Sequence, residues 1–312
     1  MALNALSSYP EGFAGGVVIT GRPLVADFGG NVFWVNSATG SDGGKGTRER
    51  PFATIAYAIS RCTANQGDTI LCAPGHAETI TSSALACSTA GVNIVGIGVG
   101  AAKPTLTFTA TSSRINVTAA NCMWKNFRWT AGVGDVVTAV LHATAAQNTQ
   151  YLDIEFFATS TFNFINCYTL GAANISDGCR WERNYLRTAD AGQLALVITA
   201  AAHNDLKFYG NYVSHAATAA GLLTAGAADL LGLDVRGNFV QTGQTDGAVG
   251  VLVITTSTAS SGMLVDNDMK TADAAANVAI PIASKVYAAR NYIAGADEVG
   301  TVVAVGTLFD NT

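Results

Sequence analysis

The chain has 312 residues, of which 49% are hydrophobic and only 12% are charged, and its formal net charge is −5. This length and apolar content allow a large buried core, whereas the slightly acidic charge leaves no basic stripe for nucleic acid. No window approaches about 18 uninterrupted apolar residues, and the start of the chain lacks a charged segment followed by an apolar one. We therefore expect no membrane segment and synthesis in the cytoplasm.

Residues 1–31 form the first segment, which contains Pro10, Pro23 and only one short apolar run, GVVIT. A stretch of this kind needs another surface to order it, so we expect an irregular arm. Two placements stay open, one along the rest of its own chain and one on a neighbouring subunit. Residues 32–312 are predicted to form a single domain.

The strand VFWVN and a polar, glycine-rich loop, SATGSDGGKGTRER, come next. The fragment GSDGGKGT differs from a phosphate-binding loop, because Gly46 rather than Ser or Thr follows Lys45 and no helix follows directly. The sequence therefore gives little support to nucleotide binding.

A helix is predicted over about residues 51–62. Phe52, Ile55, Ala56 and Ile59 fall on one helical face, and Pro51 suits a first helical turn. The open end of a stack of strands exposes unpaired backbone, which natural proteins cover. We expect this helix to be an N-terminal cap.

The rest of the chain repeats one pattern, an apolar strand, a corner and a second strand. Its apolar residues alternate and are rich in Val, Ile, Phe and Tyr, which indicates strands rather than helices. A further apolar run follows most corners. Two to three short strands per period are typical of one coil of a parallel β-helix, so we expect about eight coils of 24–29 residues. The copies are centred on Asn126, Glu155, Asn184, Asn211, Asn238, Asn267 and Asn291.

The columns of this alignment predict which side chains share an environment. Two apolar columns, which include Met123, Leu152 and Phe157, are expected to point inward, with Arg128 as a misfit. The corner column is expected to be a structural ladder, because Asn side chains stacked about 4.8 Å apart can hydrogen-bond to one another. Its members are Asn126, Asn184, Asn211, Asn238, Asn267 and Asn291.

The residue after each corner is aromatic in most coils. A stacked aromatic row is favourable by itself, so a purely structural role is one interpretation. If the row faces outward, it is a lengthwise stripe that a sister subunit would bury. The row consists of Phe127, Phe156, Tyr185, Tyr212, Phe239 and Tyr292, and Asp268 interrupts it.

Charged residues in the repeats are the remaining candidates for chemistry. Asp153 and Glu155 are followed by Glu182 one coil later and by Arg236 further on. Opposite charges interleave along the outer columns, a pattern typical of a solvated face with weak ion pairs. One outer column holds Tyr151, Arg180, Lys207 and Asp234, and the other holds Asp153, Glu182, Tyr209 and Arg236.

Neither the cysteines nor the histidines have the spacing of metal ligands. We interpret the cysteines as small buried hydrophobic residues in a reducing compartment, and His76 as a hydrogen-bonded turn residue. The sequence predicts no catalytic, cofactor or metal site. The residues concerned are Cys62, Cys72, Cys87, Cys122, Cys167, Cys179, His76, His142, His203 and His215.

Residues 33–80 carry a resemblance to a known superfamily. The order of a strand, SATGSDGGKGTRERPFATIAYAI and then GDTILCAPGHAET resembles the entry segment of pectate-lyase-like right-handed β-helices. With MALNALSSYPEGFAGGV ahead of it, the first 80 or so residues resemble structural proteins of tailed bacteriophages.

That resemblance implies a virion protein without enzymatic activity, assembled in the host cytoplasm. The expected role is a homotrimeric capsid decoration, or cement, protein whose partners are its own copies and the major capsid protein or another virion protein. A tail fibre or tailspike that contacts host glycans is the alternative, and a polysaccharide lyase or hydrolase is a weaker one. We expect no tip domain of the kind that tailspikes carry, since the repeats run to the end of the sequence.

Overall fold

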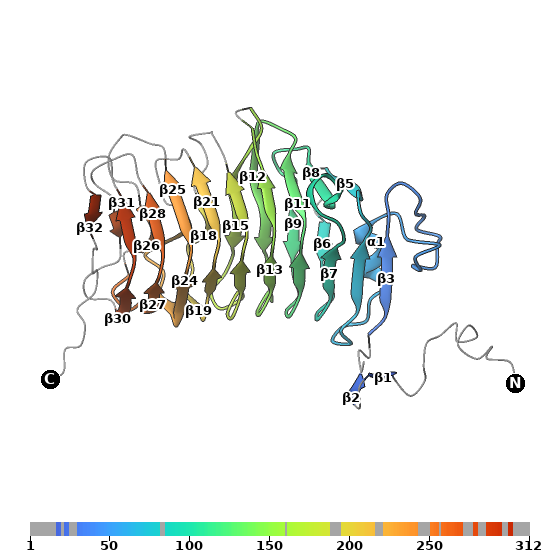
Figure 1. Cartoon of the computed structure of the whole chain (residues 1–312), viewed down its shortest axis with the longest axis horizontal. Coiled ribbons are helices and arrows are strands. Elements are labelled where there is room, and N and C mark those ends of the chain that lie inside the picture. Colours follow the sequence, from blue (N-terminus) through green and yellow to red (C-terminus); the bar gives the residue numbers. More distant parts are fainter. Residues whose placement is uncertain are drawn as a thin grey trace, which may run out of the picture.

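The computed structural model is an all-β solenoid. It describes residues 17–19, 22–24, 30–81, 85–159, 161–187, 195–215, 221–242, 250–255, 257–270, 277–279, 285–294 and 299–301. Three parallel sheets run along its length, and eight successive coils each contribute one strand to every sheet (Figure 1). This confirms the predicted right-handed parallel β-helix of about eight coils.

Each sheet takes one face of the solenoid. Sheet 1 consists of β3 (Val32–Val35), β4 (Thr69–Cys72), β7 (Asn93–Gly96), β10 (Met123–Lys125), β13 (Gln150–Leu152), β16 (Arg180–Glu182), β20 (Lys207–Tyr209), β24 (Leu233–Arg236), β27 (Ser261–Val265) and β30 (Lys285–Ala289). Sheet 2 consists of β5 (Ala77–Ile80), β8 (Thr105–Phe108), β11 (Arg128–Ala131), β14 (Glu155–Phe157), β17 (Tyr185–Arg187), β21 (Tyr212–His215), β25 (Phe239–Thr242), β28 (Asp268–Lys270), β31 (Tyr292–Ala294) and the antiparallel β32 (Val299–Thr301). Sheet 3 consists of β6 (Leu85–Cys87), β9 (Ile115–Val117), β12 (Asp135–His142), β15 (Asn163–Leu170), β18 (Ala195–Thr199), β22 (Leu223–Gly226), β26 (Gly250–Thr255) and β29 (Asn277–Ala279).

Four short strands and one 3-10 turn lie outside these sheets. β1 (Val17–Ile19) pairs antiparallel with β2 (Arg22–Leu24), the two strands described within the predicted arm. The rest of residues 1–29 lies outside the described residues, so the placement of the arm stays a prediction. β19 (His203–Asn204) pairs with β23 (Leu230–Leu231), and a single 3-10 turn covers Gly100–Ala102. No helix among the described residues is long and apolar enough to cross a membrane.

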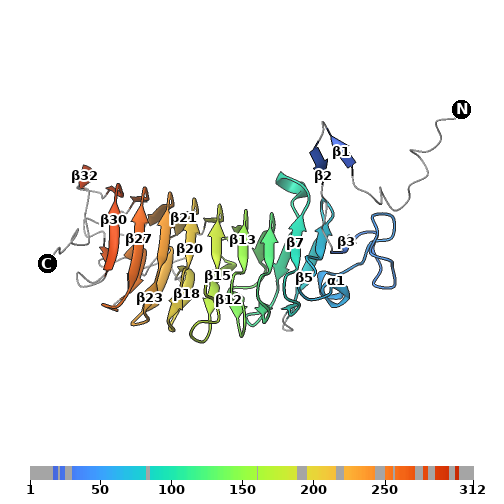
Figure 2. The same cartoon turned by 90° about the horizontal axis from the view of Figure 1, so that it is seen from below.

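Helix α1 (Ile55–Arg61) lies at the N-terminal end of the solenoid, where it packs against β3, β4 and β6 (Figures 1 and 2). Ile55, Ala58 and Ile59 are buried in the core, whereas Ala56 is exposed. The side chain of Thr54 accepts a hydrogen bond from the Tyr57 N–H and caps the helix. The helix therefore covers the strand edges as expected.

The start of this helix differs from the prediction. Pro51 is not in its first turn, because Phe52 forms a parallel bridge with Val35 and continues the extended chain. The carboxylate of Asp42 accepts hydrogen bonds from the N–H groups of Ala53 and Thr54 at 2.9 and 3.1 Å. This loop residue fixes the turn that delays the helix to Ile55.

Aromatic side chains fill the interior of the central coils. Trp129 lies 5.2 Å from Phe156, 5.9 Å from Tyr168 and 6.1 Å from Trp124 between ring centroids. Trp181 stacks on Phe208 at 4.8 Å one coil further on. Packed aromatic pairs add to the stability that burial of their area provides, and these coils hold the largest of the fully buried side chains, Trp124, Trp129 and Trp181.

The third and fourth coils are each shifted by one residue, in opposite directions, relative to the predicted alignment with the fifth coil. Trp124 and Tyr151, rather than Met123 and Leu152, align with the buried Trp181. In sheet 2 the equivalent shift places Phe156 inside and leaves Phe157 outside. Because side chains alternate along a strand, a shift of one residue exchanges the inner and outer faces. Arg128 turns outward, and Trp129 takes the inner position.

The corner from sheet 1 to sheet 2 contains only two residues at each of the seven turns from β10–β11 to β30–β31. Its first residue has a left-handed backbone, a conformation that Gly, Asn and Asp adopt most readily. Its N–H donates to a carbonyl of the following coil, as in Gly210 to Arg236 at 3.0 Å. These first positions are Asn126, Asp153, Arg183, Gly210, Gly237, Asp266 and Arg290.

The second corner position is the asparagine ladder, which consists of Asn184, Asn211, Asn238, Asn267 and Asn291, all buried. Each Oδ1 accepts the backbone N–H of the same position one coil earlier, at 2.9–3.1 Å. Each Nδ2 donates to a backbone carbonyl, at 2.8–3.1 Å. The amides therefore satisfy corner backbone groups that would otherwise be buried without partners.

Asn126 does not belong to this ladder, contrary to the prediction. It occupies the first corner position, and Phe127 and Ile154 stand in the ladder position of their coils. Its Nδ2 instead donates to the carbonyls of Gly96 and Gly98, at 2.8 and 2.9 Å. Since asparagine suits both the left-handed position and the ladder, its residue type alone does not distinguish them.

A buried histidine links two coils in the interior. His142 Nε2 lies 2.7 Å from the Tyr151 hydroxyl, and its Nδ1 lies 2.7 Å from the Ser176 hydroxyl. Burial, with a smaller contribution from His203, lowers the pKa of His142 to about 3. The imidazole is therefore neutral at physiological pH and acts as an internal hydrogen-bond link.

The first prediction concerns the ladder. Asn238→Ala removes the acceptor of the Asn211 N–H and leaves buried groups unpaired, so we expect a loss of about 2–4 kcal/mol in the free energy of unfolding. Urea denaturation measures this loss. Asn116→Ala, in a half-buried position outside the ladder, is the control and should cost less than about 0.5 kcal/mol. Equal losses would contradict the role of the ladder.

The second prediction concerns pH. The folded-state pKa of His142 lies below its unfolded value, so only the unfolded chain gains this proton as the pH falls below about 6.5. His142 thus leaves stability unchanged above that pH, and lowers it by up to about 1.4 kcal/mol per pH unit on acidification. Urea denaturation from about pH 7 to 5 should show a smaller pH slope in His142→Gln than in the parent chain. An identical slope would contradict this.

Candidate functional site

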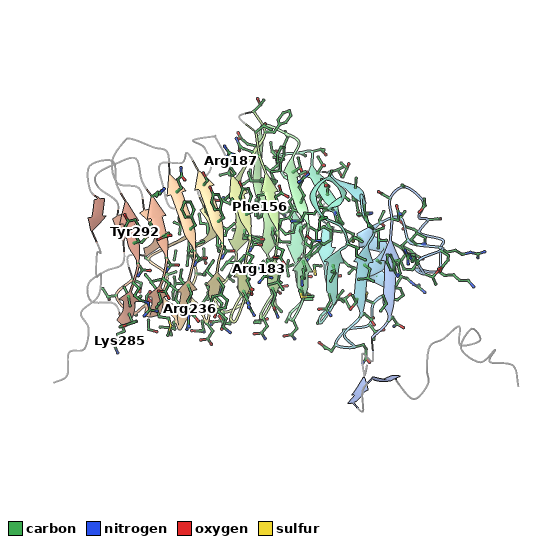
Figure 3. The ribbon with its side chains drawn as sticks, in the orientation of Figure 1. Phe156, Arg183, Arg187, Arg236, Lys285 and Tyr292 are labelled. Carbon is green, nitrogen blue, oxygen red and sulfur yellow. The ribbon has the colours of Figure 1, made fainter. Side chains whose placement is uncertain are left out.

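The outer face of sheet 2 carries the aromatic row. We define the aromatic stripe as Tyr185, Tyr212, Phe239 and Tyr292, which come from β17, β21, β25 and β31. Tyr185 and Tyr292 are 39% and 41% exposed, and Tyr212 and Phe239 between them are half-buried (Figure 3 labels Tyr292). Asp268 interrupts the stripe on β28, as the alignment predicts.

Within the stripe, three rings stack face to face. The centroids of Tyr185 and Tyr212 lie 4.9 Å apart with an interplanar angle of 10°, and those of Tyr212 and Phe239 lie 4.9 Å apart at 8°. The strand spacing imposes this distance, because equivalent residues of parallel strands lie side by side. The stack therefore presents ring edges and hydroxyls outward and covers its inner ring faces.

Phe127 and Phe156, the other two residues of the predicted row, do not belong to the stripe. Both are buried, with exposed fractions of 0% and 1%. Phe127 occupies the ladder position, and Phe156 the inner column of sheet 2. They are buried because the third and fourth coils are shifted by one residue relative to the predicted alignment. The apolar Phe157 is exposed instead, beneath the guanidinium of Arg128 at 5.9 Å.

The charged side chains of sheet 1 and its corner form an ion-pair ladder. Arg183 bonds both oxygens of Asp153, at 2.8 and 3.1 Å, and Arg290 bonds Asp266 in the same way four coils later (Figure 3 labels Arg183). Glu182 pairs with Arg180 and Arg183. The predicted interleaving of opposite charges is present.

Two residues of the predicted outer columns lie elsewhere. Tyr151 is in the core, so Gln150 aligns with Arg180, Lys207 and Asp234. Asp153 is in the corner, so Leu152 aligns with Glu182, Tyr209 and Arg236. The Tyr209 hydroxyl donates to Asp234 at 2.8 Å, and burial together with this bond raises the pKa of Tyr209 to about 12.

A concave groove of about 410 Å³ lies beside the corner of the fourth coil. It is lined by Lys103, Asp153, Ile154, Glu155, Arg183 and Tyr185. It thus joins the two acidic residues singled out from sequence to the first ring of the aromatic stripe. Lys103, which sequence reasoning missed, comes from the long corner between β7 and β8, and only its position after a glycine-rich insertion could have drawn attention to it.

Each carboxylate of this groove is already bound by an arginine side chain. Arg128 bonds both oxygens of Glu155, at 3.2 and 3.3 Å, and Arg183 bonds both oxygens of Asp153. A general acid or base must exchange its proton with a substrate, and a carboxylate held in two charge-assisted bonds is poorly suited to that. The arrangement therefore favours binding over catalysis.

A second pocket, of about 280 Å³, lies near the N-terminal end. Trp34 and Pro51 line it, and the guanidinium of Arg48 lies 5.5 Å from the Trp34 ring centroid. Its remaining lining residues are Asn36, Ala73, Pro74 and Ile97, so none of the described residues that line it is a carboxylate, histidine or thiol. This lining offers a surface for contact and no acid or base.

His76, His142, His203 and the cysteines lie in structural positions, whereas the side chain of His215 lies outside the described part of the chain. His76 is buried, accepts the Ser37 N–H at 3.0 Å and lies 3.3 Å from Glu78, so it organises the turn as predicted. All six cysteines are free, and burial raises the pKa of Cys62 and Cys179 to about 12. Across the described ranges, no three His, Cys, Asp or Glu residues are grouped so that they could hold a metal.

Comparison with known proteins gives likeness in fold. No family model and no curated protein matches the chain. Among solved structures it is similar to a rhamnogalacturonan lyase, with 13% identity and a TM-score of 0.49 over 78% of this chain and 69% of that one. It is also similar to the pectin methylesterase from Aspergillus niger, with 12% identity and a TM-score of 0.45 over 95% and 92%. It is similar as well to a GH136 lacto-N-biosidase from Eubacterium ramulus, with 12% identity and a TM-score of 0.41 over 85% of this chain and 68% of that one.

The third prediction tests the register that separates core from stripe. Phe156→Ala creates a cavity among Trp129, Phe164 and Tyr168 and should lower the free energy of unfolding by about 3–5 kcal/mol. Tyr185→Ala, on the outer face one coil later, should cost about 1 kcal/mol. Urea denaturation of both variants below the concentration at which the chain self-associates makes the comparison. A larger loss for Tyr185→Ala would overturn the assigned register.

Proposed function

We propose that this chain is a structural protein of a tailed-bacteriophage virion, a homotrimer that decorates and cements the capsid. The aromatic stripe on the outer face of sheet 2 carries the self-association in this proposal. Exposed, contiguous apolar side chains on a soluble protein mark contact surfaces. The phage particle and the number of three subunits come from the resemblance of the first 80 or so residues to phage structural proteins.

The geometry of the stripe supports a protein partner over a glycan. A sugar ring binds an aromatic side chain by lying on its face, and the stack covers both faces of Tyr212 with Tyr185 and Phe239. What the stripe offers instead is a straight row of ring edges with two hydroxyls. Tyr and Phe are enriched in the cores of protein interfaces, where such edges pack against a matching surface. A tailspike that reads host glycans is therefore the weaker alternative.

The state of the charged groups supports a structural role over an enzymatic one. In the groove, Asp153 and Glu155 are each held by an arginine. The low charge content of the chain, 12%, also suits a protein that buries its lateral faces against other copies. Stability of the assembly would then come from stacked coils and from association together.

The fourth prediction is that Tyr212→Asp releases monomers. A charge in the middle of a buried aromatic stripe loses its water, so the dissociation constant should rise about 30-fold or more, the size of an interface hot spot. Sedimentation velocity measures the change. Gln150→Asp, which adds the same charge to the outer face of sheet 1, is the control and should remain associated. An unchanged oligomer in Tyr212→Asp would refute the role of the stripe.

The place in the virion needs a separate test. The purified protein is mixed with empty capsids, and the capsids are pelleted. A trimer that pellets with the capsids supports decoration. A trimer that stays in the supernatant shifts the proposal to the tail, and a stable monomer argues against both assemblies.

A further inference from the structure

We propose that the groove lined by Lys103, Asp153, Glu155, Arg183 and Tyr185 is a binding site for a carboxylate attached to a flat, apolar group. The carboxylate would pair with the Lys103 ammonium, and the flat group would lie on the Tyr185 ring. This inference does not depend on the proposed virion role. It rests on the charges in and around the groove, the few partners of the Lys103 ammonium, and the face of the Tyr185 ring that Tyr212 does not cover.

The charge balance of the groove leaves one cation in excess. Lys103 and Arg183 in its lining, with Arg128 beside it on Glu155, supply three positive charges, and Asp153 and Glu155 supply two negative ones. Each carboxylate is held in two bonds by its own arginine, and Glu155 makes only a 4.0 Å ion pair with Lys103. The next acidic residue along the corner, Glu182, pairs with Arg180 and Arg183. The unmatched charge therefore resides on Lys103.

The surroundings of Lys103 make this charge available to a ligand. Its side chain is only 17% exposed, and its Nζ lies 4.0 Å from the nearest Glu155 oxygen. It donates one hydrogen bond of 3.1 Å, to the Asp153 carbonyl, although an ammonium has three donors. Burial lowers the pKa of Lys103, against the opposing effect of Glu155 and Asp153. An anion would supply a partner for the remaining donors of the ammonium.

Tyr185 supplies the second half of the site. One face of its ring is covered by Tyr212, and the other faces the neighbouring coil, where Glu155 and the groove lie. Tyr185 is therefore the first of the three stacked rings, Tyr185, Tyr212 and Phe239. A flat group on this face would stack as the next ring does, which is worth about 0.5–1.5 kcal/mol beyond its buried area.

Benzoate is the probe, because it combines a carboxylate with a flat ring. We titrate 4-fluorobenzoate into the full chain and follow its fluorine NMR signal, with 4-fluorobenzamide as the uncharged equivalent. We expect the benzoate to bind at least about 10-fold more tightly than the benzamide, since a bond to a charged group contributes about 1.5–3 kcal/mol. Lys103→Met should remove this preference, and Tyr185→Leu should weaken both probes.

Lys270→Met is the matched control, because Lys270 is an exposed cation on the same outer face of sheet 2 but lies outside the groove. It should bind benzoate like the parent chain. The titration is repeated in Tyr212→Asp, so that a subunit contact over the stripe cannot hide the groove. Equal binding of the two probes, full benzoate affinity in Lys103→Met, or no binding in either background would overturn the proposal.

Discussion

The solenoid depends on how it satisfies the backbone at the corner between sheets 1 and 2. Strands pair with the coils before and after them, but a corner interrupts this pairing in every coil and turns N–H groups inward. From the fourth coil onward, the ladder Asn184 to Asn291 supplies a side-chain acceptor for the N–H of the second corner position and a donor for a nearby carbonyl. The corner can thus be as short as two residues, and the two flanking sheets stay in register along the length of the molecule.

That register determines what the outside of the protein presents. Equivalent residues of successive coils lie side by side, so any residue type that recurs with the period becomes a continuous surface column. The aromatic stripe and the ion-pair ladder are two such columns, one on sheet 2 and one around sheet 1 and its corner. Both proposed contacts, with another subunit and with a carboxylate, meet at Tyr185, where the aromatic column ends.

Much of this architecture could be predicted from sequence, because period and alternation are local signals. The fold, the number of coils, the cap and most of the ladder follow from them. The third and fourth coils could not be aligned correctly. Asn126 suits either of two neighbouring corner positions, and the fourth coil has no asparagine at its corner, so Glu155 was aligned there although it lies one residue later. The resulting shift misplaced Phe127 and Phe156. The groove was beyond sequence reasoning, because Lys103 and Asp153 are brought together by stacking and not by any spacing along the chain.

The short corner also decides where such a protein can change. From β16 onward the two-residue corner from sheet 1 to sheet 2 holds a ladder asparagine, and an insertion there would remove its amide from its neighbours. Insertions are tolerated only at the other two corners of each coil, or at the corner from sheet 1 to sheet 2 in the coils that precede Asn184. The corner 97–104 lies in that permitted region, and it is this longer loop that delivers Lys103 to the groove. Variation in binding chemistry among solenoids built this way is therefore confined to defined edges of the molecule, while the ladder edge stays constant.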